Sequence, residues 1–476
     1  MGALWEMVYS NAGRWPDASA VRGSTDVTYA ELMRRVHRLR GRMRVEPGQV
    51  VAIDATPSVT GLTAILAALA ADAVFVPLDR QAPETRRNQV LRDSRAVALV
   101  TEASGEDVGT VVALDADASS SLGTSGYLMY TSGSTGTPKG VLVAEDVLLQ
   151  RLRGLASVPG FGTESSILAL TALSFDICLA ELLLPLIVGG AVVTAPAAAR
   201  LNHQDFTSAV DAFRPTVVQA TPSFFRLMIA SGWDRRLPVE IWCGGEALTA
   251  DLAANLLSVS DRLWNMYGPT EATIWATAGP VSPGAQVSLG DPLPGTRLEL
   301  RSPDGEVLTG PGAEGEIVLT GDGIAEGYVR NHAVDRSGFV DAATAERCYA
   351  TGDRARYRSD LTLEFLGRID GQIKIRGHRI ELGDIEAAML SHPDVVECAA
   401  FGRLLGTSDA HIVAVVSATA GTAVRDLRHW LRERLPLAYL PREIKVQATL
   451  PHSTAGKINR SAIEASLDSP GVHSVG

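Results

Sequence analysis

Lysine is rare in this chain of 476 residues, because only four of its 43 basic residues are lysines. They stand at positions 139, 374, 445 and 457, and the other basic residues are arginines. Lysine carries a compact ammonium group on a flexible stem, whereas the guanidinium of arginine is planar. Three of the four lysines lie in the motifs described below, which supports a functional role for them only weakly.

Cysteine and positive charge are also in short supply. The four cysteines, Cys178, Cys243, Cys348 and Cys398, are widely separated. Their spacing matches neither a metal site nor a disulfide framework, so we expect a protein of the reducing cytoplasm. The formal net charge of −11 argues against a surface for nucleic acid or anionic membranes.

Apolar runs typical of a membrane span are missing as well. Ala55–Ala71 is uncharged, but it is rich in alanine and threonine and stops at Asp72. A transmembrane helix needs about 20 predominantly apolar residues, so we expect a buried helix instead. Glu6 interrupts the first apolar residues and no basic segment precedes them, so no secretory signal is expected.

Helical and β-branched segments alternate through most of the chain, which is typical of α/β domains. Residues 28–39 predict a capped amphipathic helix, and 50–53 and 73–76 predict buried strands around the alanine-rich helix. Beyond about residue 285, short strands separated by Gly, Pro and Asp predict a β-rich subdomain. We expect a large domain over residues 1–369, with two α/β subdomains and the β-rich one, and a small α+β domain over residues 370–476.

A loop rich in glycine and hydroxyl groups is the most informative segment. It contains Thr131, Ser132, Gly133, Ser134, Thr135, Gly136, Thr137, Pro138, Lys139 and Gly140. Glycines permit close approach of the backbone to a ligand, and the hydroxyls and the ammonium suit a polyphosphate. The spacing is not that of a Walker A motif, which requires Gly-Lys-Ser/Thr at the start of a helix. Apolar runs on both sides predict that the loop joins two strands; the alternative is a flexible surface loop.

This loop resembles the phosphate loop of the adenylate-forming enzymes, a superfamily of amino-acid adenylation domains, acyl-CoA synthetases and luciferases. Further segments resemble the motifs of that superfamily in their usual order. They are residues 27–32, 69–79, 175–176, 265–271, 315–317, 349–353, 367–386 and 456–460. The resemblance covers almost the whole chain and implies attack of a carboxylate on the α-phosphate of ATP, which yields an acyl-adenylate and pyrophosphate.

The resemblance also implies roles for individual residues. Glu271 would bind Mg²⁺, Tyr267 would stack on adenine, and Asp353 would bind the ribose hydroxyls with Arg368 nearby. Lys457 would bridge the substrate carboxylate and the α-phosphate, with Thr131 and Glu271 as the other catalytic residues. The implied ATP site comprises Thr131, Ser132, Gly133, Ser134, Thr135, Gly136, Lys139, Gly244, Gly245, Glu246, Met266, Tyr267, Gly268, Thr270, Asp353 and Arg368.

Simpler roles stand beside these. Tyr267 could be a core aromatic, Asp353 a turn residue and Lys457 an ordinary surface lysine. The neighbourhood of Lys457 departs from the family, with Ala455 for the usual Asn and Asn459 for the usual Asp, and Ala438 stands where Tyr is usual.

Asp370 matches the hinge about which family members rotate a mobile C-terminal domain after adenylation. A plain β-turn at Asp370 is compatible with that role.

Asp176 narrows the substrate class. In the amino-acid-activating branch of the family, the matching aspartate pairs with the substrate ammonium; the alternative is a helix cap. The implied substrate pocket comprises Asp176, Ile177, Ala180, Gln219, Ile241, Cys243, Met266, Ile274 and Trp275, with Lys457. The pattern is similar to that of glycine-activating domains but departs from it at Ala180, Ile241, Cys243 and Met266. We therefore expect glycine or another small α-amino acid.

The resemblance implies transfer of the product to the phosphopantetheine thiol of a carrier protein. The sequence contains no carrier domain, so we expect a separate carrier, and an MbtH-like helper is compatible with the family. Alternatives are a ligase for a larger or β-amino acid, an acyl- or aryl-CoA ligase that accepts amine-free acids, and a catalytically silent adenylate-binding protein.

Overall fold

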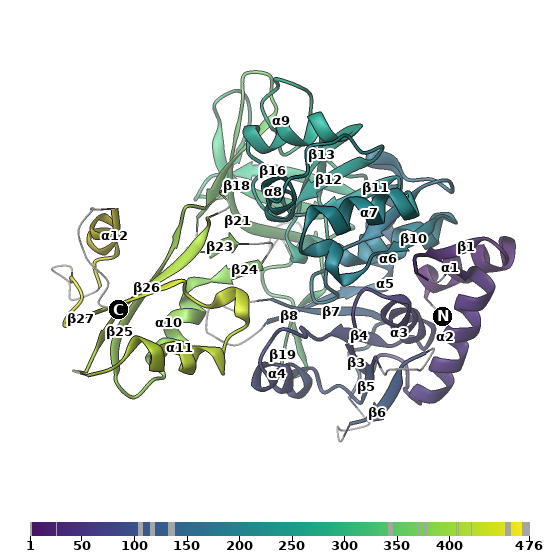
Figure 1. Cartoon of the computed structure of the whole chain (residues 1–476), viewed down its shortest axis with the longest axis horizontal. Coiled ribbons are helices and arrows are strands. Elements are labelled where there is room, and N and C mark those ends of the chain that lie inside the picture. The colour runs from purple at the N-terminus through teal and green to yellow at the C-terminus, as the bar shows by residue number, and fades with distance from the viewer. Residues whose placement is uncertain are drawn as a thin grey trace. The chain divides into compact units, whose positions relative to one another are not determined.

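A computed structural model describes most of the chain (Figure 1). The described residues are 2–24, 26–102, 108–114, 120–131, 139–340, 346–369, 372–375, 378–405, 407, 409–419, 421–452 and 458–468. The chain divides into two compact units. The first comprises residues 1–80, 90–130 and 139–370, and the second comprises residues 81–89, 131–138 and 371–476.

The first unit is built on two large sheets and a smaller one. Sheet A runs in the order β15 (Asp291–Pro292), β14 (Thr277–Pro280), β13 (Arg262–Tyr267), β12 (Glu240–Gly244), β11 (Val217–Ala220), β9 (Ser166–Ala169), β10 (Ala191–Thr194), β1 (Ser19–Arg22) and β2 (Val27–Thr28). From β13 to β1 neighbouring strands are parallel, and the pairings at the two edges are antiparallel.

Sheet B runs in the order β20 (Ala333–Asp335), β19 (Gly327–Arg330), β8 (Lys139–Ala144), β7 (Gly126–Thr131), β4 (Val74–Pro77), β3 (Val50–Asp54), β5 (Ala98–Thr101) and β6 (Thr110–Ala113). Sheet C contains β17 (Val307–Leu308), β16 (Thr296–Arg301), β18 (Glu314–Gly321), β21 (Cys348–Tyr357) and β22 (Leu363–Arg368). Sheet C is antiparallel and forms the β-rich part expected beyond residue 285.

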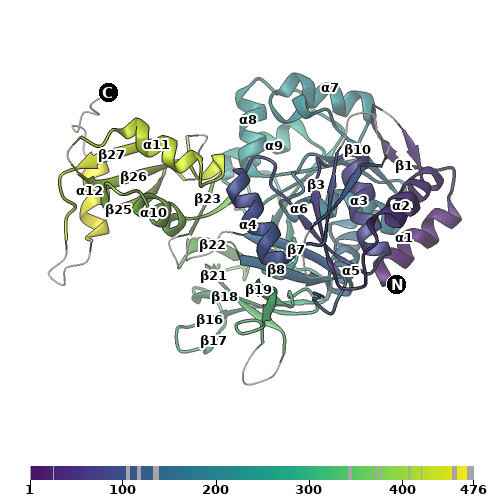
Figure 2. The same cartoon turned by 90° about the horizontal axis from the view of Figure 1, so that it is seen from below.

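Helices fill the space between sheets A and B and cover their outer faces (Figure 2). One apolar cluster joins both sheets to α1 (Ala3–Arg14), α2 (Tyr29–Met43), α3 (Val59–Ala70), α5 (Glu145–Leu155) and α6 (Ile177–Val188). A second joins the other face of sheet A to α7 (His203–Phe213), α8 (Pro222–Ala230) and α9 (Ala250–Val259). A third packs Val90 of α4 (Glu84–Ser94) against sheet B. Short helical turns are η1 (Ala156–Gly160), η2 (Ala197–Arg200) and η3 (Thr270–Ala272).

The local predictions for the N-terminal part are confirmed. Helix α2 begins after Thr28, whose hydroxyl accepts the N–H of Glu31 at 3.2 Å, and it ends at Met43, one turn later than predicted. The alanine-rich segment forms α3, in which every residue from Gly61 to Ala70 is buried. Strands β3 and β4 flank α3 and pair in parallel. In the described part of the chain no helix is both long enough and apolar enough to cross a membrane.

The second unit contains two small sheets. They are β23 (Gln372–Ile375) with β24 (His378–Glu381), and β25 (Val395–Arg403) with β26 (His411–Ala418) and β27 (Glu443–Gln447). The larger of the two packs against α10 (Leu382–Leu390) and α11 (Val424–Arg432) on one face and against Ile463 of α12 (Arg460–Asp468) on the other. A short turn, η4 (Leu437–Tyr439), precedes β27. The predicted domain boundary at Asp370 lies outside the described residues and stays a prediction.

Candidate active site

The predicted site residues gather at the carboxyl edge of sheet A. Gln219 lies near the end of β11, Gly244 ends β12 and Tyr267 ends β13. The carboxyl ends of parallel strands meet at one edge of a sheet, which is where open α/β sheets bind ligands. Asp176 immediately precedes α6, and Glu271 lies in η3, which follows β13. The fold therefore explains how segments 175–180, 219, 244–246 and 265–276 come together.

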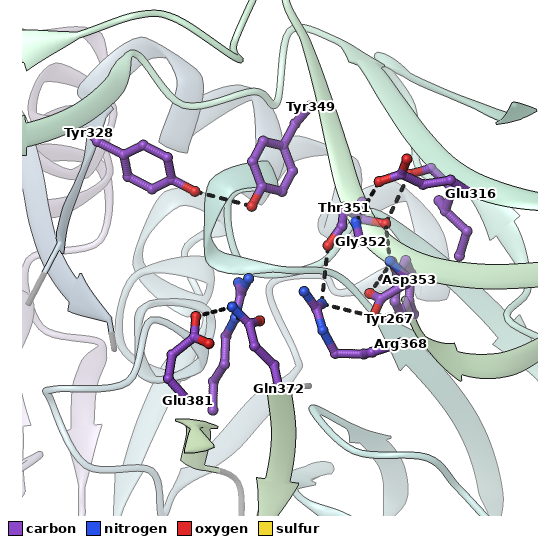
Figure 3. A network of polar contacts seen from close by, with 12 residues as sticks. Tyr267, Glu316, Tyr328, Tyr349, Thr351, Gly352, Asp353, Arg368, Gln372 and Glu381 are labelled. Carbon is purple, nitrogen blue, oxygen red and sulfur yellow. Dashed lines mark hydrogen bonds and ion pairs between the residues drawn. The ribbon is translucent and has the colours of Figure 1, made fainter. Parts of the chain in front are cut away.

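Asp353 lies at the centre of the first group of polar residues (Figure 3). The hydroxyl of Tyr267 donates to its Oδ2 at 2.7 Å, and Nη1 of Arg368 donates to its Oδ1 at 2.9 Å. Asp353 and Arg368 are directly opposite in the antiparallel pair of β21 and β22, which explains their contact. Arg368 also donates to the carbonyl of Thr351 at 3.1 Å. Burial and the neighbouring carboxylate raise the pKa of Tyr267, so its hydroxyl remains a donor.

Glu271 belongs to a second group on the same edge. It is 1% exposed, and its Oε1 accepts the hydroxyl of Tyr328 at 2.8 Å. The hydroxyls of Tyr328 and Tyr349 lie 3.1 Å apart and point toward each other in Figure 3. The ammonium of Lys139 lies over the ring of Tyr328, 4.8 Å from its centre. The Glu271 carboxylate and the Lys139 ammonium therefore contact the same tyrosine, and Lys139 begins the strand that follows the glycine-rich loop.

Arg151 stabilises the turn that carries Glu271 through hydrogen bonds. This arginine is 2% exposed, and it donates to the carbonyl of Ala272 at 3.1 Å and to the Thr296 hydroxyl at 2.8 Å. Burial lowers the pKa of its guanidinium to about 10, so the group stays charged at neutral pH. Gly323 leaves room for it, because a Cβ there would lie 1.7 Å from Nη2 of Arg151.

Asp176 does not act as a helix cap. It precedes α6 with helical dihedral angles, and its side chain makes no capping hydrogen bond. Instead, its Oδ2 accepts the N–H of Ile274 at 3.3 Å, and the residue is 2% exposed. Thr273 and Ile274 both have a positive φ, 58° and 67°, which is a strained conformation for β-branched residues. This strained turn directs the Ile274 amide at the carboxylate.

Gln219 connects two further residues of the predicted pocket, Ile177 and Trp275, with Glu181, which was not predicted. Its Oε1 accepts the indole N–H of Trp275 at 2.8 Å, and its Nε2 donates to the carbonyl of Ile177 at 2.9 Å and to Glu181 at 3.2 Å. All are buried. Burial raises the pKa of Glu181 to about 7, although four hydrogen bonds favour its charged form.

Two glycines make the close packing around Trp275 feasible. A Cβ on Gly244 would lie 2.3 Å from the carbonyl oxygen of Met266 and 2.7 Å from Cη2 of Trp275. A Cβ on Gly268 would lie 2.7 Å from Cα of Trp275 and from the amide nitrogen of Ala276. Any larger residue at these positions would displace the indole or the strand ends. The sequence prediction that placed both glycines in the ATP site did not foresee this packing role.

Four other predicted site residues, Ala180, Thr270, Gly245 and Glu246, lie close in the chain to the residues described above. Ala180 is buried one turn after Asp176 in α6, and Thr270 begins the turn that carries Glu271. Glu246 accepts the Ser223 hydroxyl at 2.6 Å. Gly245 has a φ of +87° and lies near Ile177, whose Cδ1 would be 3.3 Å from a Cβ there.

Ile241 and Cys243 belong to the cluster on the opposite face of sheet A from Ile177 and Trp275. Successive side chains of a strand point to opposite faces, and Trp242 between them joins the inner cluster. Burial keeps the pKa of the Cys243 thiol well above its ordinary value. Hydrogen bonds therefore link Asp176 to Ile274, and Gln219 to Ile177 and Trp275, whereas Ile241 and Cys243 pack into the other cluster. The role of these residues in a substrate pocket stays a prediction.

Several predicted residues lie outside the described part of the chain. They are Ser132, Gly133, Ser134, Thr135, Gly136, the hinge Asp370 and Lys457. Thr131 is described and ends β7, and Lys139 begins β8. The glycine-rich segment therefore joins two strands, as predicted. The roles assigned to these residues stay predictions.

The residues that the sequence prediction missed are Tyr328, Glu181 and Arg151. Tyr328 reaches Glu271 only because β19 pairs with β8, a contact between segments almost 190 residues apart in the chain. Glu181 and Arg151 belong to none of the recognised motifs, although α6 also carries Ile177 and Ala180 of the predicted pocket. Glu181 is the one charged residue of α6, and a lone charge in an apolar helix is the signal that could have found it. Helix α5 also carries Glu145, Asp146 and Arg153, so the sequence contains no such signal for Arg151.

Comparison with known proteins places these contacts in a family context. Residues 8–329 match the family model described as AMP-binding enzyme, and residues 384–457 match the one described as AMP-binding enzyme C-terminal domain. The dimodular nonribosomal peptide synthase of Bacillus subtilis (strain 168) is 32% identical over 493 residues, which is 97% of this chain and 21% of that protein. Phosphinothricin tripeptide synthetase PhsC of Streptomyces viridochromogenes is 34% identical over 504 residues, which is 98% of this chain and 45% of that protein. The chain thus spans less than half the length of these relatives.

Solved structures agree with the fold. A four-domain nonribosomal peptide synthetase bound to AMP and glycine has a TM-score of 0.70 and 29% identity, over 100% of this chain and 37% of that one. The Vibrio cholerae adenylation domain AlmE, in complex with glycyl-adenosine-5'-phosphate, has a TM-score of 0.84 and 21% identity, over 98% of both chains. The second likeness, at this level of identity, concerns the fold alone.

Proposed function

The chain belongs to the AMP-binding enzyme family, and on that basis we propose that it activates a small α-amino acid as its aminoacyl-adenylate. The acceptor of the activated amino acid would be the phosphopantetheine thiol of a separate carrier protein. Family membership confirms the superfamily predicted from the motifs and supports an adenylate-forming ligase that uses ATP. We propose the identity of the amino acid, the acceptor and the roles of single residues on the grounds that follow.

The buried carboxylate of Asp176 is the observation that carries the amino-acid assignment. A carboxylate that is 2% exposed is costly in an apolar pocket unless a cation or donors accompany it. The Ile274 amide donates to Asp176 at 3.3 Å, and the side chain makes no capping hydrogen bond to α6, which argues against the helix-cap alternative. A substrate ammonium supplies the matching charge, whereas an amine-free acid does not.

The remaining geometry suits the nucleotide half of the reaction. In the proposed reaction the amino-acid carboxylate attacks the α-phosphorus, the bond to the bridging oxygen breaks, and pyrophosphate leaves with that oxygen. Asp353 would accept the ribose hydroxyls, with its position fixed by Tyr267 and Arg368. These hydrogen bonds hold the carboxylate in place before substrate binds, which reduces the cost of ordering it.

A magnesium ion fits Glu271. Mg²⁺ prefers oxygen ligands and in nucleotide sites is held mainly by phosphates and water, with one or two carboxylates from the protein. Among the described residues no group of three His, Cys, Asp or Glu side chains forms a metal cage, which agrees with that arrangement. Glu271 would hold the ion, Tyr328 would orient the carboxylate, and the ion would neutralise phosphate charge.

The small size of the amino acid is supported by Trp275. The indole is fully buried, and it packs against Gly244 and is fixed by Gln219. The relative of 29% identity was solved with AMP and glycine, which supports the same substrate class here. Carrier-protein transfer is supported by the nonribosomal peptide synthases among the relatives.

Amino-acid-dependent exchange of pyrophosphate into ATP tests the proposal. The panel comprises glycine, alanine, β-alanine, phenylalanine and the amine-free acids propionate and benzoate. We expect glycine or alanine to give the fastest exchange, and loading of a phosphopantetheinylated carrier added as a separate protein. Faster exchange with an amine-free acid and release by free coenzyme A would indicate a CoA ligase. Binding of ATP with no exchange in the whole panel would indicate a silent adenylate-binding protein, and either result contradicts the proposal.

A further inference from the structure

Glu181 is a fully buried carboxylate next to the candidate pocket, and no role assigned above uses it. It lies in α6, four residues after Ile177. Its Oε2 accepts the N–H groups of Leu170 and Thr171, both at 2.9 Å. Its Oε1 accepts the Thr171 hydroxyl at 2.5 Å and Nε2 of Gln219 at 3.2 Å. A buried carboxylate with four donors is expensive, since an apolar residue of similar size would avoid the desolvation cost.

The position of Glu181 determines which way the Gln219 amide faces. Nε2 of Gln219 donates to Glu181 and to the Ile177 carbonyl, and Oε1 accepts the Trp275 indole N–H. If the amide were reversed, its oxygen would face two acceptors and its NH₂ group would face the indole N–H. The observed orientation is therefore the one that satisfies all three partners.

We propose that Glu181 is a positioning residue for substrate selection, which fixes Gln219 and through it holds the Trp275 indole where it limits substrate size. The proposal rests on the proposed function, because it concerns the amino-acid pocket. Trp275 has little freedom while the hydrogen bonds last, since its Cη2 and Cζ3 atoms lie directly against Gly244. Loss of the hydrogen bond to Gln219 would release the indole N–H and allow the ring to shift.

The Glu181→Gln variant tests this chain of hydrogen bonds. Its amide has one oxygen, and the two main-chain N–H groups cannot rotate away, so the oxygen will accept them. Its NH₂ group will then face Nε2 of Gln219, and the two donors repel. We expect the ratio of kcat/KM for glycine over alanine and larger amino acids to fall about tenfold, with the KM for ATP unchanged.

Two comparisons distinguish a positioning role of Glu181 from a general loss of structure in the Glu181→Gln variant. Glu145→Gln is the matched control, because Glu145 is also a buried carboxylate, but its partners are the Trp5 amide and the Ser125 hydroxyl. We expect that control to leave the ratio unchanged. In a double-mutant cycle, Glu181→Gln should change the ratio little further when Trp275→Phe is present, because phenylalanine cannot donate to Gln219.

Each outcome bears on the proposal. An equal loss of activity for all amino acids in Glu181→Gln, or the same fall in ratio with and without Trp275→Phe, would overturn it. If Glu181→Gln fails to fold, Glu181→Asp replaces it, because aspartate keeps the charge but is too short to reach Gln219. An unchanged ratio of kcat/KM for glycine over larger amino acids in Glu181→Asp would also overturn the proposal. If the wild-type enzyme activates no amino acid, the proposed function fails and this inference falls with it.

Discussion

Replacement of Asp176 by asparagine keeps the size of the side chain and removes its charge. At an effective dielectric constant of about 20, an ion pair at 4 Å is worth about 4 kcal/mol. Because Asp176 is 2% exposed, solvent does little to screen that interaction. We therefore expect kcat/KM for the amino acid to fall about 1,000-fold in ATP–pyrophosphate exchange, with the KM for ATP within about twofold of wild type.

The matched control is Asp261→Asn. Asp261 lies just before β13, at the amino end of the strand and so away from the carboxyl edge, and it is paired with Arg236 on the surface. We expect less than about a twofold change from that substitution, in line with the small contribution of exposed ion pairs. A loss below about tenfold in Asp176→Asn would refute the reasoning, because the ammonium would then have its main partner elsewhere.

Three further predictions follow from the same contacts. Glu271→Gln should lower kcat/KM for ATP about 100-fold and raise the Mg²⁺ concentration needed for half-maximal exchange. Tyr328→Phe should change both quantities less, and equal effects of the two substitutions would contradict the assigned roles. Tyr267→Phe should raise the KM for ATP about fivefold, as expected for one hydrogen bond of about 1 kcal/mol. Asp353→Asn should raise it about 100-fold, because it removes the charge of a buried carboxylate that pairs with the partly buried Arg368. Burial raises the pKa of Glu181 from 4.5 to about 7, so the folded protein binds this proton more tightly than the unfolded chain and the stabilisation is complete below about pH 4.5. This stabilisation is lost as the pH rises through 7. Between about pH 4.5 and above pH 7, the free energy of unfolding of wild type, measured in urea, should therefore fall by about 3 kcal/mol relative to that of Glu181→Gln. Parallel plots of unfolding free energy against pH for the two proteins would contradict the raised pKa.

Much of the fold could be predicted from local patterns. The cap at Thr28, the alanine-rich helix between two buried strands, and the change to short strands beyond residue 285 are all features of neighbouring residues. The superfamily was predictable because its motifs occur in order along the chain, and the family matches confirm it, as they do the α/β fold with a large N-terminal and a small C-terminal domain.

The partners of the site residues could not be predicted in the same way. The sequence indicated a role for Glu271 but not Tyr328, because their contact depends on the pairing of β19 with β8. It grouped Ile241 and Cys243 with Trp275 but did not indicate that both pack into the apolar cluster on the opposite face of sheet A, and their role in the pocket stays a prediction. Long-range strand pairing and the direction of side chains at strand ends decide these contacts, and neither is a local property of the sequence.

A comparison of glycine with glycolate tests the central claim most directly, because the two acids differ only in an ammonium and a hydroxyl group. The buried carboxylate of Asp176 predicts rapid ATP–pyrophosphate exchange with glycine and a kcat/KM for glycolate at least about 100-fold lower. Asp176→Asn should bring the two values together. Equal exchange with both acids in the wild-type enzyme would contradict the account.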